Sequence, residues 1–415
     1  MTRRPFWLLV HRWGGLAMTP FLIIVGLTGA VIPFTDELDA ALNPGWFRVP
    51  IEARPLLDPL VLHDRVDAAA APWARLDYAV LSVKVGESVR YLLTANTNPD
   101  SGRPYELTYD QLFFNPYTGE QLGGRRYAAN SLDRENLMNF LNRLHYCLAM
   151  PTERLAVIGG YVLGITAVLW TLDCFVAFYL TLPVRRSSRT LSDGGSTRRR
   201  RWRTAWVIKW PTNPFRFNFD LHRATGLWTW VLLLVLAWSS VSLNLGEVYR
   251  PVTRALFGLR PDLPIAVQSN RPPALGWRAA LETGRTLMRE QARQGAFAVL
   301  REDTLEHDDA RGAYVYTVYS NLDRARWPMT SVTFDATDGH LLRADWPGEP
   351  GEQAGDVVTR WITWLHMAAV FGPALQITIS LLGVAIVGLA GTGVVIWWKK
   401  HKVRFARRGP TLPAR

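Results

Sequence analysis

Long apolar stretches divide the chain into membrane-like and polar parts. Only one charged residue, Asp173, lies within these stretches. A helix rises about 1.5 Å per residue, so about 20 apolar residues cross a hydrocarbon core of about 30 Å. The pattern therefore predicts four transmembrane helices and excludes a soluble enzyme. The stretches are Trp13–Phe34, Leu155–Leu182, Ala224–Gly246 and Ala374–Trp398.

The two longest polar connections, 35–140 and 247–356, are each large enough for a small domain. In each, a helix-like stretch precedes segments in which apolar residues alternate or cluster, as they do in strands. This order predicts an α+β domain in each connection. The helix-like stretches are Leu60–Ala71 and Trp277–Gln294, and the strand-like segments are Tyr78–Val85, Val89–Ala95, Leu112–Asn115, Gly312–Tyr319 and Met329–Phe334.

The apolar stretches carry a sequence repeat. His-Arg-x-x-Gly-Leu opens the first stretch at His11 and the third at His222. A Leu-His pair and then a proline precede the second stretch at His145 and the fourth at His366. We therefore expect a membrane α-helical protein with α+β extracytoplasmic domains, whose four transmembrane helices form two pseudo-symmetric halves about an axis normal to the membrane.

The repeat and the hydropathy pattern together set the expected boundaries. Each half runs from a transmembrane helix through an outer domain to an interfacial helix and a second transmembrane helix. The expected parts are transmembrane helix 1 in 1–34, the first outer domain in 35–140, an interfacial helix and transmembrane helix 2 in 141–182, a basic cytoplasmic loop in 183–221, transmembrane helix 3 in 222–246, the second outer domain in 247–356, an interfacial helix and transmembrane helix 4 in 357–398, and a basic cytoplasmic tail in 399–415.

The formal net charge of +12 arises in three short segments, residues 1–12, 183–223 and 399–415. Basic flanks mark the cytoplasmic side of a membrane protein, so both termini are expected in the cytoplasm. Runs such as Arg198–Arg201 are interpreted as topology signals, with anionic membrane lipid as an expected contact. The charge is therefore explained by topology, and nucleic acid is not an expected partner.

Four of the eight histidines occupy positions matched by the repeat. His11 and His222 start outward-running helices, so both are expected at the cytoplasmic level. His145 and His366 precede inward-running helices, so both are expected at the outer level. One interfacial histidine is commonly a helix cap or a membrane anchor, but ionisable groups at membrane depth indicate function, and two matched pairs favour a site. The short helices carrying the outer two are expected at Asn136–Ala149 and Val357–Phe371.

Two facing imidazoles at one level suit haem iron, because the porphyrin fills the equatorial plane and leaves two axial positions. Zinc requires four ligands, or three and a water, and no carboxylate or cysteine pair lies near these histidines in the sequence. We therefore expect two haem groups. His11 and His222 would be the axial iron ligands of one haem, and His145 and His366 those of the other.

Basic and small residues flank the expected haem ligands. Arg12 and Arg223 would pair with the propionates of the inner haem, and Arg143 and Arg360 with those of the outer one. The alternative is that these arginines anchor helices at the membrane interface. Small residues would either admit a flat ring or pack helices together; they are Gly14, Gly15, Gly159, Gly160, Gly226 and Gly372.

The remaining histidines are not matched between the halves, and we expect them to be solvated. For Asp173 we expect a carboxylate that snorkels to the membrane interface or is hydrogen-bonded, with bracing of a ligand or proton movement as alternatives. The unmatched histidines are His63, His307, His340 and His401.

Together these motifs resemble the PepSY-associated transmembrane proteins of bacterial inner membranes. The resemblance rests on the His-Arg-x-x-Gly-Leu motifs at His11 and His222, the Leu-His pairs at His145 and His366, and the Asn-Pro-Tyr-Thr-Gly-Glu turn at 115–120. It covers almost all of residues 1–402. The order and spacing of the motifs carry it, since no single motif is strongly specific.

The resemblance implies a fold and an activity. It implies PepSY folds for the outer domains, haem b at the four matched histidines, and an oxidoreductase that reduces ferric siderophores in the periplasm to release iron. The turn at 335–339 lacks the Pro-Tyr pair of the turn at 115–120, so its equivalence in ligand contact does not follow.

A pair of haems at opposite membrane levels would carry electrons from the cytoplasmic side to a periplasmic acceptor. The chain holds no Gly-rich dinucleotide fingerprint, so quinol, a flavin or a soluble reductase would have to supply the electrons. One alternative is a non-enzymatic, membrane-anchored PepSY module that binds or regulates an envelope partner. Another is a haem carrier that delivers electrons to a protein or a quinone.

Overall fold

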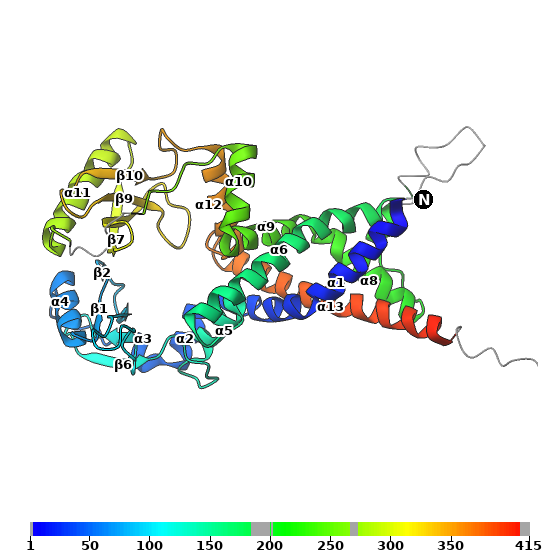
Figure 1. Ribbon diagram of the computed structural model, residues 1–415, viewed down its shortest axis with the longest axis horizontal. Helices are drawn as coiled ribbons and strands as arrows, with labels where there is room; N and C mark the ends of the chain where they lie inside the picture. The colour runs from blue at the N-terminus through cyan, green and yellow to red at the C-terminus, as the bar shows by residue number, and fades with distance from the viewer. Residues whose placement is uncertain (1–2, 184–199, 201, 266–272, 407–415) are drawn as a thin grey trace, which may run out of the picture.

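The computed structural model describes residues 3–183, 200, 202–265 and 273–406. Helices form an elongated bundle, and two polar segments, 35–140 and 247–356, lie at one end of it (Figure 1). We call these the first and second outer segments. The start of the chain lies at the opposite end of the bundle. Most of the Arg198–Arg201 run and residues 407–415 of the expected tail lie outside the described residues.

Three helices in the described part are long and apolar enough to cross a membrane. They contain most of the first, second and fourth apolar stretches of the sequence. Local sequence sets where two of them begin: the Thr152 side chain accepts a hydrogen bond from the Leu155 amide, and Pro373 opens the last helix, where its missing N–H costs no hydrogen bond. The helices are α1 (Arg3–Gly29), α6 (Glu153–Thr181) and α13 (Pro373–Ala406).

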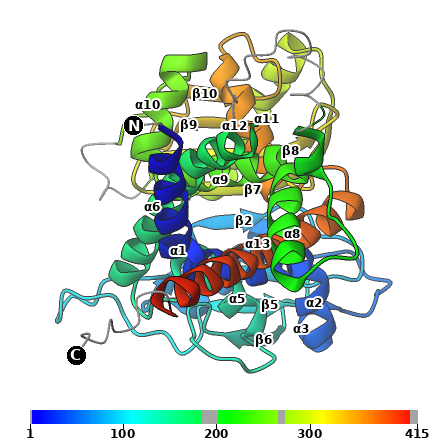
Figure 2. The ribbon, with the colours of Figure 1, turned by 90° about the vertical axis from the view of Figure 1, so that its right-hand side faces the viewer.

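The third apolar stretch is not the straight helix expected over 222–246. It is divided between α8 (Pro214–Trp228) and α9 (Trp230–Asn244), which meet at an angle of 68°. Thr229, with φ −99° and ψ 0°, ends α8 and starts α9. The bend lays α8 beside α13 (Figure 2), where the Asn218 side chain donates to the Thr392 carbonyl at 3.0 Å. α8 and α9 together can form a fourth span.

Glycines set the closest approach between helices of the bundle. A Cβ on Gly26 of α1 would lie 2.9 Å from the Gly383 carbonyl oxygen of α13, and a Cβ on Gly383 would lie 2.5 Å from the Gly26 carbonyl oxygen. A Cβ on Gly159 would lie 2.1 Å from the Cys147 carbonyl oxygen. Small residues that let backbones touch are typical of helix pairs in membranes. Gly26, Gly383 and Gly159 therefore serve helix packing.

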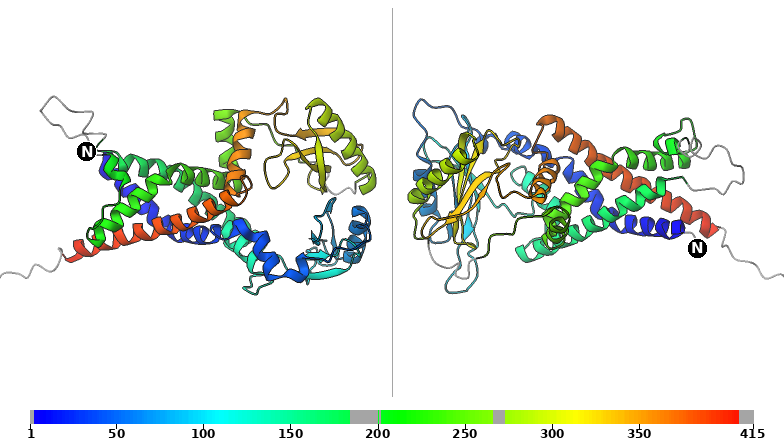
Figure 3. Two further views of the ribbon diagram at one scale, coloured as in Figure 1. Left: turned by 180° about the vertical axis from the view of Figure 1, so that it is seen from behind. Right: turned by 90° about the horizontal axis from the view of Figure 1, so that it is seen from above.

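Antiparallel sheets dominate the outer segments, with helices packed on them (Figure 3). The first segment contains the strand pair β1-β4 and the three-stranded sheet β3-β5-β6, and the five-stranded sheet has the order β10-β9-β8-β7-β2. The strands are β1 (Ala74–Arg75), β2 (Tyr78–Val80), β3 (Val89–Leu92), β4 (Thr94–Ala95), β5 (Gln111–Phe114), β6 (Gln121–Arg125), β7 (Val299–Asp308), β8 (Ala313–Ser320), β9 (Thr330–Asp335) and β10 (Leu341–Asp345). The other helices are α2 (Thr35–Leu42), α3 (Pro44–Phe47), α4 (Pro59–Ala70), α5 (Leu137–Cys147), α10 (Gly246–Phe257), α11 (Trp277–Gln294) and α12 (Ala354–His366).

The five-stranded sheet joins the two outer segments. β2 of the first segment pairs with β7 of the second, with Ala79 opposite Leu305. Both side chains are fully buried. The Ser82 hydroxyl extends the contact by donating to the Glu302 carbonyl at 2.5 Å. The pattern of the sequence predicts strands in both segments, but it does not predict that a strand of the first segment pairs with a strand of the second.

One histidine of the first outer segment is buried in the same contact. His63 on α4 is 1% exposed, and its ring centre lies 4.3 Å from that of Trp277 on α11. The expectation that His63 is solvated is therefore wrong, because the inner face of α4 packs against the second segment. His307 on β7 is half-buried beside Tyr314, and this burial lowers the pKa of its imidazole. His401 is exposed on α13, and its ring stacks on Trp397.

Candidate cofactor site formed by two histidine pairs

The inner pair consists of His11 and His222, which lie at the end of the bundle away from the sheets. His11 comes from α1 and His222 from α8. Their ring centres are 6.2 Å apart, with 59° between the ring planes. The bend at Thr229 sets the direction of α8, so it determines where His222 lies. The structure thus brings these two sequence-predicted residues together.

The outer pair consists of His145 and His366, which lie near the outer segments. His145 lies in the last turn of α5 and His366 is the last residue of α12. Their ring centres are 6.3 Å apart, with 67° between the planes. After each helix the chain takes up positive φ before the next long helix begins, at Leu148 and Ala149 in one case and at Ala368 and Phe371 in the other.

Two hydroxyls orient the outer pair. Nδ1 of His145 lies 2.9 Å from the Thr28 hydroxyl, and Nδ1 of His366 lies 2.8 Å from the Ser239 hydroxyl. Thr28 donates its own proton to the Ile24 carbonyl, and Ser239 donates to a carbonyl one turn back. Each hydroxyl therefore accepts from an Nδ1–H group, because it has only one proton to give. Both outer rings keep an unprotonated Nε2.

The inner pair is also held through Nδ1, but by different groups. Nδ1 of His11 lies 2.9 Å from both carboxylate oxygens of Asp173 on α6. Nδ1 of His222 lies 3.1 Å from the Leu389 carbonyl and 3.0 Å from the Thr392 hydroxyl on α13. A carboxylate or carbonyl oxygen can only accept, so both Nδ1 atoms carry the proton. Nε2 is again the nitrogen left for a metal, as in sites whose ligand histidines are held through the other nitrogen.

The ring spacing fits one metal ion between two imidazoles. A metal–imidazole bond is about 2.0 Å long, and the nitrogen lies about 1.1 Å from the ring centre, so two imidazoles on opposite sides of one ion have ring centres about 6.2 Å apart. The observed spacings are 6.2 and 6.3 Å. Neither pair belongs to a larger group of potential metal ligands in the described part of the chain. Two axial ligands and no more suit haem iron and not zinc.

Space around the pairs depends on glycine. A Cβ on Gly29 would lie 3.1 Å from Cε1 of His145, so a side chain there would press on the ring. A Cβ on Gly393 would lie 3.4 Å from Cε1 of His222. Among the glycines singled out from the sequence, Gly14 and Gly15 next to His11 border open space, whereas Gly159 packs on backbone. Of the others, Gly160 and Gly226 lie at contact distance from neighbouring helices and Gly372 has φ +57°.

The arginines expected to hold propionates are mostly engaged by protein groups. Arg223 pairs with Asp220 at 2.9 Å and donates to the Thr204 carbonyl. Arg143 is buried and donates to Asn130 and to the Ala128 and Met150 carbonyls. Arg360 pairs with Glu352 at 2.5 Å. In the described structure Arg12 has no hydrogen-bond or ion-pair partner, so it is the arginine of this set that is available to a ligand.

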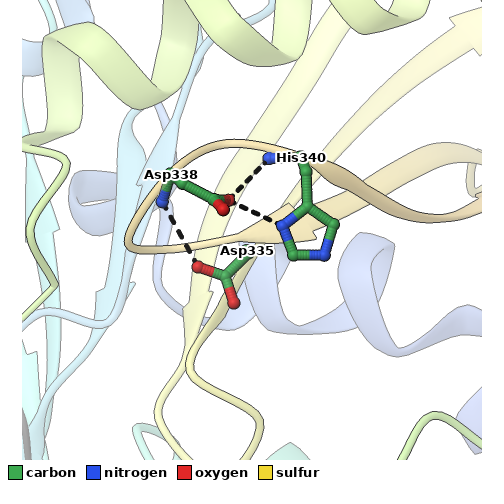
Figure 4. A group of neighbouring side chains, drawn as sticks. All are labelled: Asp335, Asp338 and His340. Atoms are coloured by element: carbon green, nitrogen blue, oxygen red, sulfur yellow. Dashed lines mark hydrogen bonds and ion pairs between the residues drawn. The ribbon is translucent and has the colours of Figure 1, made fainter.

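A second group of potential metal ligands lies in the turn between β9 and β10 (Figure 4). Asp335, Asp338 and His340 bring their ligand atoms within 4.8 Å of one another. Hydrogen bonds inside the turn account for this grouping: Asp335 accepts from the Asp338 amide, and Asp338 accepts from both the amide and the ring of His340. The bond to Asp338 raises the pKa of His340. His340 is exposed, as expected, and the group forms a turn and not a cofactor site.

Sequence reasoning did not identify the hydroxyls that hold the histidines. Thr28 and Ser239 follow His11 and His222 at equal spacing along the chain, so the repeat contains a signal for them. Both are polar residues inside apolar stretches. Thr392 has no such signal, because its partner role depends on the bend that brings α8 to α13.

The apolar helices, the sheets at one end and the two histidine pairs within the bundle define a membrane protein with α+β outer structure. The family profile described as PepSY-associated TM region matches residues 8–400, so the chain belongs to this family. The resemblance inferred from the motifs is thereby confirmed. No curated protein matches the chain.

Proposed function

We propose that this protein is a di-haem b oxidoreductase of the bacterial inner membrane that carries electrons to a periplasmic ferric siderophore. The observation that carries the proposal is the pairing of His11 with His222 and of His145 with His366 at a spacing that fits one iron each. A haem held at each pair supplies reversible one-electron chemistry. The chain supplies the ligands, their orientation and the path between two membrane levels.

The hydrogen bonds at Nδ1 support this proposal. They fix the tautomer and the orientation of all four rings, so that Nε2 is ready to bind iron without reorganisation. Thr28 and Ser239 do so at matching points of the repeat. This match also supports the arrangement of the chain as two pseudo-symmetric halves. Arg12 is suited to one propionate of the inner haem, because its guanidinium has no partner in the described protein.

The two pairs lie at different depths along α1. His11 is a residue of α1 itself, whereas His145 contacts α1 at Thr28, about 25 Å further along a helix that rises 1.5 Å per residue. Trp170 of α6 packs in the bundle against a cluster that includes Leu233 and Leu382. This arrangement supports transfer across the membrane and not along one surface.

The direction of transfer follows from the basic segments and the outer sheets. Basic residues near the termini and in the loop before α8 favour a cytoplasmic location for the inner pair. The outer segments then lie in the periplasm, above the outer pair. A ferric chelate is a suitable acceptor, because reduction to ferrous iron weakens the hold of hard oxygen ligands. The donor is a quinol, a flavin or a soluble reductase.

Reoxidation by a ferric chelate tests the proposal. Protein purified in detergent and reduced with dithionite, with excess reductant removed, is mixed anaerobically with ferric siderophore and a ferrozine-type trap. We expect haem oxidation with one ferrous iron trapped per electron. His366→Ala should slow this reaction at least tenfold, whereas His307→Ala, at a half-buried histidine outside both pairs, should not.

Two results would point to the alternatives. Reduced haem that no ferric chelate reoxidises would indicate a protein or quinone acceptor. A protein without haem, after expression with abundant haem, would favour a membrane-anchored PepSY module that binds an envelope partner.

A further inference from the structure

Asp173 is the acidic residue of the apolar stretches, and its carboxylate contacts one histidine. Both carboxylate oxygens lie 2.9 Å from Nδ1 of His11, and the side chain is 15% exposed. Among the described residues no lysine or arginine forms an ion pair with Asp173. Arg4, near the same end of the bundle, instead donates to the Leu180 and Leu182 carbonyls. The negative charge therefore acts on the ring of His11 without a neutralising cation.

The other three histidines of the two pairs have neutral partners. His145 and His366 contact hydroxyls, and His222 contacts a carbonyl and a hydroxyl. The outer pair is thus held symmetrically by matched groups, whereas the inner pair has a carboxylate on one side only. This carboxylate is an electrostatic difference between the immediate surroundings of the two pairs.

We propose that Asp173 is a positioning residue that makes the inner pair the lower-potential centre of the protein and so directs electrons outward. This inference rests on the proposed function, because it requires that both pairs bind haem. It adds a determinant of direction that the histidines alone do not provide.

The physical reason is the effect of a partly buried negative charge on iron. A carboxylate that accepts from Nδ1–H makes the imidazole a stronger electron donor through Nε2. It also stabilises the ferric state, which has one more positive charge than the ferrous state, and the low dielectric of the bundle strengthens this interaction. Both effects lower the reduction potential at His11. A hydroxyl partner exerts neither effect to the same degree.

The resulting transfer is balanced in electrons. With haem held by His11 and His222 and by His145 and His366, one electron would pass from the inner iron to the outer iron, so that the inner iron is oxidised from ferrous to ferric and the outer iron is reduced from ferric to ferrous. The donor class named above, a quinol, a flavin or a soluble reductase, returns the inner iron to the ferrous state, and the ferric chelate removes the electron from the outer iron.

Potentiometric titration of Asp173→Asn tests the inference. Asparagine keeps the size of the side chain and an oxygen acceptor but removes the charge. The titration is run in the His366→Ala background, where only the inner haem is expected, and in the otherwise wild-type chain. We expect the reduction potential of the inner haem to rise. The equilibrium constant for electron transfer should change at least tenfold, which corresponds to about 59 mV for one electron. The outer potential should stay unchanged.

Matched variants separate charge from packing. Thr171→Val, on the same helix with its hydroxyl bonded to the Ala167 carbonyl, should leave both potentials unchanged. Asp173→Glu should keep the inner potential low. If Asp173→Asn loses the inner haem, Ser239→Asp provides a second test, because a carboxylate on His366 should lower the outer potential by a similar amount.

The outcomes distinguish this inference from the proposed function. A chain without haem would overturn the proposed function. Two bound haems with an inner potential that Asp173→Asn leaves unchanged, or an outer potential that Ser239→Asp leaves unchanged, would overturn the role of Asp173 and leave the proposed function standing.

Discussion

Thr28 and Ser239 stand at equal distances after His11 and His222 in the chain, and each accepts a hydrogen bond from Nδ1 of an outer-pair histidine. The two hydroxyls lie in different helices, α1 and α9, and act on rings from two further helices. The sequence repeat therefore places the same hydrogen-bond acceptor next to each histidine of the outer pair. Four helices must be correctly placed for the outer pair to form.

Ser239→Ala should weaken cofactor binding at the outer pair by about 10- to 100-fold, because loss of a partner at the second nitrogen has this effect on metal-ligand histidines. Haem retention during a competition with apomyoglobin measures it. Ser240→Ala is the matched control, since the Ser240 hydroxyl bonds the Leu236 carbonyl and no histidine. Equal haem loss from both variants would contradict a specific role for Ser239.

Arg125 should be essential for the stability of the first outer segment. Its guanidinium is 1% exposed and makes two bonds to the equally buried Asp39, at 2.9 and 2.6 Å. Arg125→Ala leaves the carboxylate unpaired, so we expect a loss of about 3–5 kcal/mol in the free energy of unfolding. Denaturant titration with the outer-segment tryptophan fluorescence as signal measures it. Arg54→Ala, at an exposed pair with Glu52, should lower the free energy of unfolding far less. An equal loss in both variants would contradict the stabilising role of the buried Arg125–Asp39 pair.

The shared sheet should permit a disulfide between the outer segments. Val80 and Thr304 are directly opposite in the antiparallel pair of β2 with β7. Directly opposite Cβ atoms are about 4.5–5.5 Å apart, close to disulfide geometry, whereas diagonal ones are about 7–8 Å apart. In a background lacking Cys147 and Cys174, the pair Val80→Cys with Thr304→Cys should oxidise readily. If the diagonal pair Val80→Cys with Glu306→Cys oxidised faster, the register of β2 against β7 would differ from the one in the structure.

Much of the helical plan can be predicted from the sequence because it depends on local periodicity. The stretch Trp277–Gln294 is helical as predicted, and the first, second and fourth apolar stretches lie in long helices. The strand β7 is not predicted from the sequence, because Val299–Asp308 is rich in charged residues. It forms a strand because it pairs with β8 on one side and β2 on the other. Tertiary pairing overrides the local pattern there.

The two histidine pairs can be predicted from the sequence, but their surroundings can be predicted only in part. Membrane depth and repetition single out His11, His222, His145 and His366. The contact of Asp173 with His11 joins α6 to α1, and no spacing in the chain encodes a contact between those helices. The bend at Thr229 is equally difficult to predict from the sequence, because neither proline nor glycine stands at Thr229 or directly beside it.

Haem content of the purified protein and of one histidine variant tests the central claim most directly. A reduced-minus-oxidised spectrum with pyridine haemochrome quantitation should give about two low-spin b haems per chain. His222→Ala should lower this to about one and leave the spectrum of the His145 and His366 haem in place. A colourless protein after expression with abundant haem, or a His222→Ala variant that loses the outer-pair signal, would contradict the account of two separate histidine-ligated haems.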